Sequence, residues 1–141
     1  MDDAQHDGYR LDEQVGFLLR RATQRHLAIF AGLIGGLTPT QFAALAKLCE
    51  MGPTSQNALG RATAMDAATI KGVIDRLRDK GLVATLPDPI DRRRLMLAPT
   101  EAGRAAYDTA RPLAQRITAD TLAPLTPAEQ AAFLALLARL G

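Results

Sequence analysis

The feature that most constrains the fold is a change in hydrophobic period that follows Gly81. Before this glycine, apolar residues recur at helical spacing. After it come two short β-compatible runs, Leu82 to Leu86 and Arg94 to Ala98, separated by the turn-rich string PDPIDRR. The pattern predicts a β-hairpin with a long, charged tip, placed directly after a helix.

Two short helices are predicted immediately before this hairpin. Ser55 can cap the first helix, and Asp66 can cap the second, which covers residues 67–80. The tight connection Ala64-Met65 separates them. Two short helices with a tight connection, followed at once by a basic hairpin, are typical of a winged helix-turn-helix.

The other helices also carry clear start signals. The capping-box strings TPTQ, from Thr38, and TPAE, from Thr126, open two of them. Pro112 should kink the helix that starts at Thr100 or divide it in two, because proline removes a hydrogen bond and crowds the preceding turn. The predicted fold class is mainly α, with helices over 11–33, from Thr38 to Gly52, over 55–63, 67–80 and 100–121, and from Thr126 onward, around one small β-hairpin.

The 67–80 helix has one apolar face, led by Ile70 and Ile74, and a second face of small, polar and basic residues. Small side chains let a helix approach base edges, methyl groups can touch thymine methyls, and lysine can reach guanine or phosphate. Gly72 costs up to about 1 kcal/mol relative to alanine in mid-helix, so packing or a close approach should offset it. The candidates for DNA contacts on this helix are Ala68, Thr69, Lys71, Gly72 and Arg76.

Positive charge is concentrated between Arg61 and Arg94, a segment with eight basic and five acidic residues in a chain of net charge +2. An arginine at a hairpin tip can enter the narrow minor groove, and Arg93 is the candidate. Asp91, two residues earlier, can orient its guanidinium, while Arg92 and Arg94 are better placed for phosphates. A solvated, charge-balanced face is the alternative interpretation of this charge run.

Length and composition indicate one compact domain over residues 1–141. The chain is 48% hydrophobic and long enough to bury a core without covalent cross-links. Cys49 stands alone, which leaves no intrachain disulfide or zinc cluster and fits a reducing compartment. The start with Asp2 and Asp3 lacks the basic region of a signal peptide, and the longest apolar run, Leu27 to Leu37, is too short for a membrane span. We expect a cytoplasmic domain without a membrane partner.

Patterns typical of catalysis are absent from the sequence. Ser55 is the single serine, and the two histidines, His6 and His26, are far apart in the chain. The string GLIGG lacks the lysine and the hydroxyl residue that a phosphate loop needs. We therefore expect no enzymatic activity, no metal site and no cofactor.

Three strings carry a resemblance to a known family: LTPTQFAALAKL, SQNALGRATAMDAATIKGVIDRLRDKGLV and PDPIDRRRLMLAPTEAG. They resemble the multiple-antibiotic-resistance regulator (MarR) family over nearly the whole chain, most specifically in DRL followed by GLV and in DPxDRR. The resemblance implies an obligate homodimer on duplex DNA at a pseudo-palindromic operator. It assigns residues 38–98 to the winged lobe and residues 11–36 and 100–141 to dimerisation helices. The wing pattern of the family maps onto Asp91 and Arg93.

The strings YRLDEQVGF and TAMDAATIKGVIDRL are similar to regulators of aromatic or heteroaromatic acid catabolism. This resemblance implies a repressor that a small aromatic acid or its thioester releases from DNA. Pro112 and the string Ala98-Pro99-Thr100 depart from the family pattern, and both bear on the course of the dimerisation helices.

His26 is the best candidate for a polar group in an effector pocket. It falls in the apolar stripe of the first helix, where the period calls for an apolar residue. An imidazole on an apolar wall could orient a carboxylate or hydroxyl group. A core histidine bonded to a backbone carbonyl is the alternative. Arg20 and Arg25 could supply charge to an acid, or could face solvent or the partner subunit.

Two other functions stay open at this point. A thiol-based redox sensor would act through Cys49, although an apolar helix face usually makes cysteine a small buried hydrophobe. A helical protein-interaction module without DNA binding would explain the helices but not the arginine-rich hairpin tip. Replacing Arg93 with alanine separates the DNA-binding function from such a module.

Overall fold

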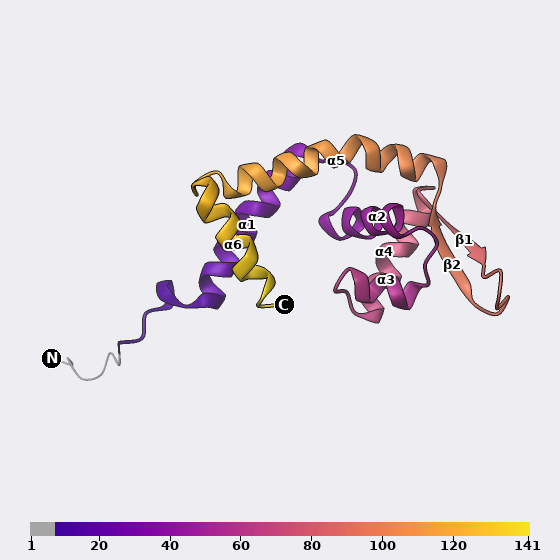
Figure 1. Ribbon diagram of the computed structural model, residues 1–141, viewed down its shortest axis with the longest axis horizontal. Coiled ribbons are helices and arrows are strands. Elements are labelled where there is room, and N and C mark those ends of the chain that lie inside the picture. The colour runs from indigo at the N-terminus through magenta and orange to yellow at the C-terminus, as the bar shows by residue number, and fades with distance from the viewer. Residues whose placement is uncertain (1–7) are drawn as a thin grey trace.

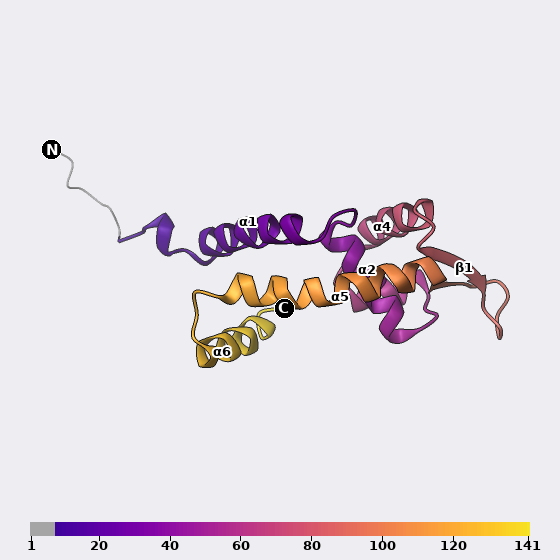
Figure 2. The same ribbon diagram turned by 90° about the horizontal axis from the view of Figure 1, so that it is seen from above.

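The computed structural model describes residues 8–141 (Figures 1 and 2). The acidic start with Asp2 and Asp3, and His6, lie outside the described residues. The chain is mainly α with one two-stranded antiparallel hairpin, as expected from the sequence. A short 3-10 helix (Leu11–Glu13) precedes α1 (Val15–Leu33), α2 (Pro39–Met51), α3 (Gln56–Ala62), α4 (Ala67–Asp79), β1 (Val83–Pro87), β2 (Leu95–Pro99), α5 (Glu101–Leu122) and α6 (Pro127–Ala138).

The helix starts follow the predicted caps. Thr38 and Thr126 form complete capping boxes, in which the cap hydroxyl accepts a backbone N–H and the side chain of Gln41 or Glu129 accepts the N–H of the cap residue. Ser55, Asp66 and Thr100 also accept a backbone N–H three residues later. These caps are local in sequence, which is why the sequence pattern predicts them correctly.

One hydrophobic core holds the helix-turn-helix and the hairpin together. It contains fully buried side chains of α2, α3 and α4, including Leu45, Leu59 and Ile74, closed by Val83 of β1 and Leu97 of β2. The connection between α3 and α4 is as tight as predicted, and Ala64 there adopts a left-handed conformation with φ 55°. In Figure 1 this group of elements lies beneath the N-terminal half of α5.

Both strands begin one residue later than the sequence suggested. Leu82 is not a strand residue, because its N–H still belongs to the end of α4 and donates to the Leu77 carbonyl at 3.0 Å. Gly81, with φ 74°, supplies the left-handed turn of this helix-ending motif. Arg94 belongs to the tip, where its N–H donates to the Asp91 carbonyl at 3.0 Å.

The hairpin has a third short partner that the sequence did not reveal. Thr54, between α2 and α3, exchanges both backbone hydrogen bonds with Leu97 of β2, at 2.7 and 3.0 Å. Thr54 is itself buried. The base of the hairpin is therefore fixed to the start of α3 as well as to α4.

A second, smaller core joins α1 to α5. Phe30 and Ile34 pack against Ala110 and Ile117 of α5. The predicted start of α1 at residue 11 is wrong, since Gln14 is extended and separates the 3-10 turn from the helix. Hydrophobic spacing continues through this break, so periodicity alone could not detect it.

Pro112 does not divide α5, which is one helix of 22 residues. Pro112 and Asp108, whose carbonyl loses its helical partner, are both exposed, so water can satisfy that carbonyl. Ala110 and Ile117 are buried on the other side and hold the helix against α1. At its start, Gly103 packs against the Leu82 carbonyl so closely that a Cβ would lie 2.0 Å from the oxygen.

In the described part of the chain, no helix combines the length and hydrophobicity needed to cross a membrane. Large apolar side chains nevertheless remain exposed on α1 and α6. These include Val15 at 65%, Leu136 at 58% and Leu18 at 48% exposure. The apolar stripe predicted for α1 is thus only partly covered within one chain.

Candidate nucleic-acid interface

The N-terminus of α4 is fixed by Asp66. Its Oδ1 accepts the Thr69 N–H at 2.7 Å. The hydrogen bonds from Thr69 hold the pKa of this carboxyl below its usual value. The first turn of α4, with the exposed residues Ala67, Ala68 and Thr69, is therefore well ordered and free of bulky side chains.

The candidate residues of α4 lie together on its outer face. Ala68, Thr69, Lys71 and Arg76 are exposed, and Gly72 is half-buried among them. Lys71 Nζ pairs with Asp75 Oδ2 at 3.0 Å, and this hydrogen bond lowers the pKa of Asp75. Such exposed pairs stabilise little, so Lys71 can exchange its partner for a phosphate or a base edge.

Gly72 has no packing reason to be a glycine within the chain. A Cβ built there would meet only Arg76 Nη1, at 3.2 Å, which is the far end of a flexible side chain. Arg76 Nη1 donates to the Gly72 carbonyl at 3.2 Å. Packing within the chain therefore does not offset the conformational disadvantage of this glycine.

The hairpin tip presents the predicted aspartate–arginine pair. Asp91 Oδ1 accepts the Arg93 N–H at 3.1 Å and lies 3.6 Å from Arg93 Nε. The contact with Asp91 orients the Arg93 side chain near its backbone, and the side chain is 95% exposed, so its guanidinium can enter a groove. Arg92 and Arg94 are exposed on either side of it.

Three residues near this surface were not singled out from the sequence. Ile90 is 97% exposed at the hairpin tip, and its N–H donates to Asp88 Oδ1 at 2.9 Å. Arg78 is exposed on α4 and lies 3.8 Å from Asp75. Lys80 belongs to the basic segment and is exposed, but its ammonium donates to the carbonyl of Gly36, in the connection between α1 and α2, and to Gln41 of α2. Sequence spacing could have indicated Arg78, but not the long-range contacts of Lys80.

The α4 surface and the wing extend on the same side of the molecule. In Figure 1, α5 lies above α2, whereas α3, α4 and the hairpin tip lie below or beside α2, away from α5. The basic and small residues of α4 and the three arginines of the tip are thus carried by one rigid core. This arrangement can place a helix in one groove and a hairpin in the next.

The three candidate effector residues are not brought together. His26 lines a cavity of about 280 Å³ between α1, α5 and α6, and its Nδ1 lies 3.0 Å from Thr121 Oγ1. Its partner is thus a hydroxyl, not the backbone carbonyl of the alternative interpretation. Arg25 is exposed, as expected, and its guanidinium donates to the carbonyls of Asp120 and Thr121 at the end of α5. Arg20 is exposed and does not line this cavity.

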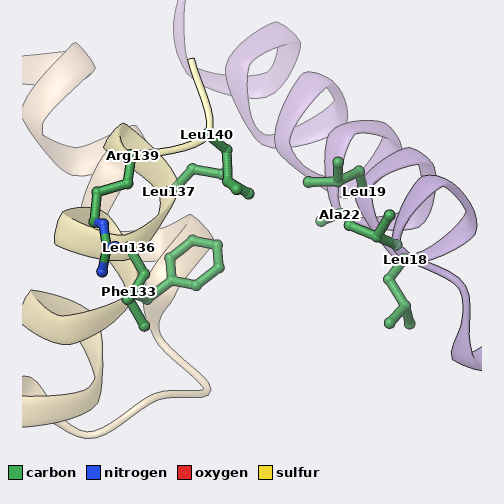
Figure 3. Close-up of a pocket in the computed structure, with 9 residues that line it drawn as sticks. Leu18, Leu19, Ala22, Phe133, Leu136, Leu137, Arg139 and Leu140 are labelled. Atoms are coloured by element: carbon green, nitrogen blue, oxygen red, sulfur yellow. The ribbon is translucent and has the colours of Figure 1, made fainter.

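An apolar groove of about 650 Å³ runs between α1 and α6 (Figure 3). Phe133 and Leu137 of α6, and Leu140 just after it, face Leu19 and Ala22 of α1 across it. The groove lies beside the cavity that His26 lines, since Leu19, Ala22, Phe133 and Leu137 border both.

Cys49 is half-buried against the first core. Burial raises the pKa of its thiol, and Asp108 and Glu50 raise it further, while Arg104 acts in the opposite direction. A raised pKa disfavours the thiolate and therefore thiol reactivity. Within residues 8–141, no group of three or more histidine, cysteine, aspartate or glutamate side chains could hold a metal ion.

Comparison with known proteins agrees with this geometry. The MarR family model matches residues 37–95, which cover the helix-turn-helix, β1 and the hairpin tip up to the first residue of β2. The transcriptional repressor NicR of Pseudomonas putida is 43% identical over 94% of this chain and 85% of its own length. The crystal structure of a probable transcriptional regulator from Pseudomonas aeruginosa superposes with a TM-score of 0.91, at 54% identity over 94% of this chain and all of that one.

A structure of BpsR from Bordetella bronchiseptica gives a TM-score of 0.89, at 44% identity over 94% of this chain and 96% of that chain. The DNA binding of BpsR is regulated by 6-hydroxynicotinic acid. These relatives are transcriptional regulators rather than enzymes. On the strength of the matched winged segment and of relatives that share most of its length, this chain belongs to the MarR family.

Proposed function

We propose that this protein is a homodimeric, cytoplasmic repressor that binds a pseudo-palindromic operator and is released from it by a small aromatic or heteroaromatic acid or its thioester. One observation carries the DNA-binding part. The exposed face of α4 has small side chains and a glycine, and the same core carries a hairpin tip whose Arg93 is 95% exposed and hydrogen-bonded to Asp91.

In this proposal, α4 enters the major groove. Ala68 and Thr69 contact thymine methyl groups, Lys71 and Arg76 reach guanine or phosphate, and Gly72 lets the helix backbone approach the base edges. Arg93 enters the adjacent minor groove, where the narrow groove concentrates negative potential. Arg92 and Arg94 bind phosphates and contribute affinity and salt dependence rather than base specificity.

The second copy covers the groove between α1 and α6. This groove exposes more apolar surface than a stable monomer needs, with Leu140 at 73% and Val15 at 65% exposure. A symmetric partner would bury these side chains and set the two α4 helices at a fixed separation. Residues 11–36 and 100–141 form the dimerisation region in this proposal, and residues 38–98 form the DNA-binding lobe.

The effector part follows from the relative BpsR and from His26. Nδ1 of His26 is engaged with Thr121, which leaves Nε2 for a ligand in the adjoining cavity. A carboxylate or ring hydroxyl on an apolar aromatic body fits such a wall. Arg20 and Arg25 are the candidates for the compensating charge; neither lines the cavity, so a ligand that reaches them must extend beyond it. Ligand binding would favour a separation of the α4 helices that no longer matches successive major grooves, about 34 Å apart.

The decisive experiment compares Arg93→Ala with Arg116→Ala in fluorescence anisotropy on a duplex selected by the wild-type protein from a random pool. Arg116 is an arginine on α5 whose side chain is also exposed; it pairs with Asp120 and is distant from the hairpin in the chain. We expect Arg93→Ala to weaken binding about tenfold or more and to lower the salt slope by about 1, because one groove contact is lost. Arg116→Ala should bind as wild type.

Equal affinity of both variants and wild type would contradict the role of the wing.

Addition of 6-hydroxynicotinic acid tests the effector part on the same duplex. We expect it to release wild type, and we expect His26→Phe to bind DNA but to resist release. Equal release of both proteins would remove His26 from the effector site.

A further inference from the structure

Lys80, the residue that directly follows α4, makes its side-chain contacts with segments outside its own helix. Its Nζ donates to Gln41 Oε1 at 3.0 Å and to the carbonyl of Gly36. Lysine at a helix C-terminus commonly interacts with the last carbonyls of its own helix. Lys80 instead bonds to residues 39 and 44 positions earlier, which belong to α2 and to the connection between α1 and α2.

The acceptors of Lys80 are themselves held in place. Gln41 is 5% exposed, and its Oε1 also accepts the Thr38 N–H at 3.3 Å as part of the capping box of α2. Gly36 lies between Leu33, the end of α1, and Thr38, the cap of α2. A single ammonium group thus bonds to a rigid, mostly buried amide and to the chain segment that leads from α1 into the winged core.

The position of these hydrogen bonds restrains how α4 and α1 can move relative to each other. The Nζ contacts join the residue that directly follows α4 to the segment by which α1 enters the winged core, so a rotation of α1 that moves this segment relative to α4 must stretch or break them. Charge-assisted hydrogen bonds are short-ranged and stronger than neutral ones. They therefore add a directional restraint on such a rotation to the apolar packing of the core.

We propose that Lys80 is a positioning residue that fixes the orientation of α4 relative to α1, and thereby sets the half-site separation that the dimer accepts. This inference rests on the proposed function, since it needs two α4 helices on one operator. Lys80 does not itself contact DNA. Its effect is on how sharply the dimer discriminates between operators that differ only in the distance between half-sites.

The test uses the duplex selected by the wild-type protein and two derivatives, with one base pair inserted at or deleted from its centre. For each protein, the ratio of affinities for the native and altered spacings is measured by anisotropy. This ratio is internal to each protein sample, so a reduced fraction of folded protein does not change it. The variants are Lys80→Met, which keeps the length of the side chain but removes its donors, and Lys80→Arg, which retains them.

The matched control is Lys47→Met. Lys47 is an exposed lysine of α2 that pairs with Glu50 at 3.3 Å, outside the contacts of Lys80. We expect Lys80→Met to reduce the discrimination between spacings by about fivefold or more, the size expected when a charge-assisted hydrogen bond is lost. Lys80→Arg and Lys47→Met should keep the discrimination of wild type.

Two outcomes would overturn the inference while leaving the proposed function intact. If Lys80→Met discriminates spacings as wild type does, its contacts do not set the separation. If Lys80→Met loses the same factor of affinity for all three duplexes, and its salt slope falls by about 1, Lys80 is a phosphate contact instead. If wild type selects no duplex at all, the proposed function fails, and the inference fails with it.

Discussion

Replacing Gly72 with alanine should raise the stability of the protein and weaken its binding to DNA. Alanine is favoured over glycine by about 1 kcal/mol in a helix interior. The added Cβ would meet only Arg76 Nη1 at 3.2 Å, and that guanidinium is exposed and can move a few tenths of an ångström. We therefore expect the free energy of unfolding to rise by about 0.5–1 kcal/mol.

The expected effect on DNA binding has the opposite sign. In the proposed complex the α4 backbone at Gly72 approaches the base edges, so a methyl group there must push the helix outward. We expect at least about tenfold weaker binding to the selected operator, or about 1.4 kcal/mol. Urea unfolding at fixed protein concentration gives the stability, and fluorescence anisotropy at fixed salt gives the affinity.

Two controls separate the possible causes. Gly32→Ala introduces a methyl group at another helical glycine with nothing within 4 Å, and it should leave DNA affinity unchanged. Combining Gly72→Ala with Arg76→Ala shows whether the methyl acts through the displaced guanidinium. If Gly72→Ala no longer weakens binding in the Arg76→Ala background, displacement of the Arg76 guanidinium is the cause. If the loss of affinity persists, the methyl group itself keeps α4 from approaching the base edges. Unchanged or tighter DNA binding by Gly72→Ala would refute the close-approach reasoning.

Three further predictions concern stability and redox behaviour. Gly103→Ala should lower the free energy of unfolding by about 2 kcal/mol or more in urea titrations, because its Cβ would lie 2.0 Å from the Leu82 carbonyl oxygen; an unchanged midpoint would show that α5 can shift. The N–H of Thr69 lowers the pKa of Asp66, so the stability that this cap contributes is complete above the ordinary pKa of 3.8 and is lost as the pH falls through the lower folded-state pKa. Unfolding midpoints measured from pH 6 to 2.5 should therefore fall less steeply for Asp66→Asn than for wild type. Parallel curves for the two proteins would contradict this. Since burial raises the pKa of the Cys49 thiol, wild type and Cys49→Ala should keep the same operator affinity after mild peroxide treatment, whereas selective loss by wild type would support redox sensing.

Sequence patterns predicted the parts of the fold that depend on neighbouring residues. The caps at Thr38, Ser55 and Asp66, and the hairpin after Gly81, follow from residue types three or four positions apart. The one-residue error in the strands arose where two local motifs compete for Leu82, whose N–H completes the end of α4. Periodicity cannot decide such a competition.

The contacts that the sequence could not reveal connect distant segments. Thr54 pairs with Leu97, Arg25 reaches the end of α5, and Lys80 reaches Gln41, each across more than thirty residues. The charges of Arg25 and Lys80 were visible in the sequence, but their partners depend on how the helices pack. Pro112 was expected to kink α5 or to divide it, and the division does not occur: α5 continues through Pro112 and packs on α1.

The unbroken length of α5 has a geometric consequence for how an effector signal reaches DNA. With 22 residues, the helix is about 33 Å long, and its two ends belong to different parts of the molecule. Near Gly103 it rests against the carbonyl of Leu82, while its second half packs on α1 (Figure 2). A rigid rod of this length acts as a lever: a tilt of about 6° at one end displaces the other by about 3.4 Å, the rise of one base pair. If the proposed function holds, a small molecule between α1 and α5 needs to turn this helix by only a few degrees to move the α4 surface out of register with its half-site.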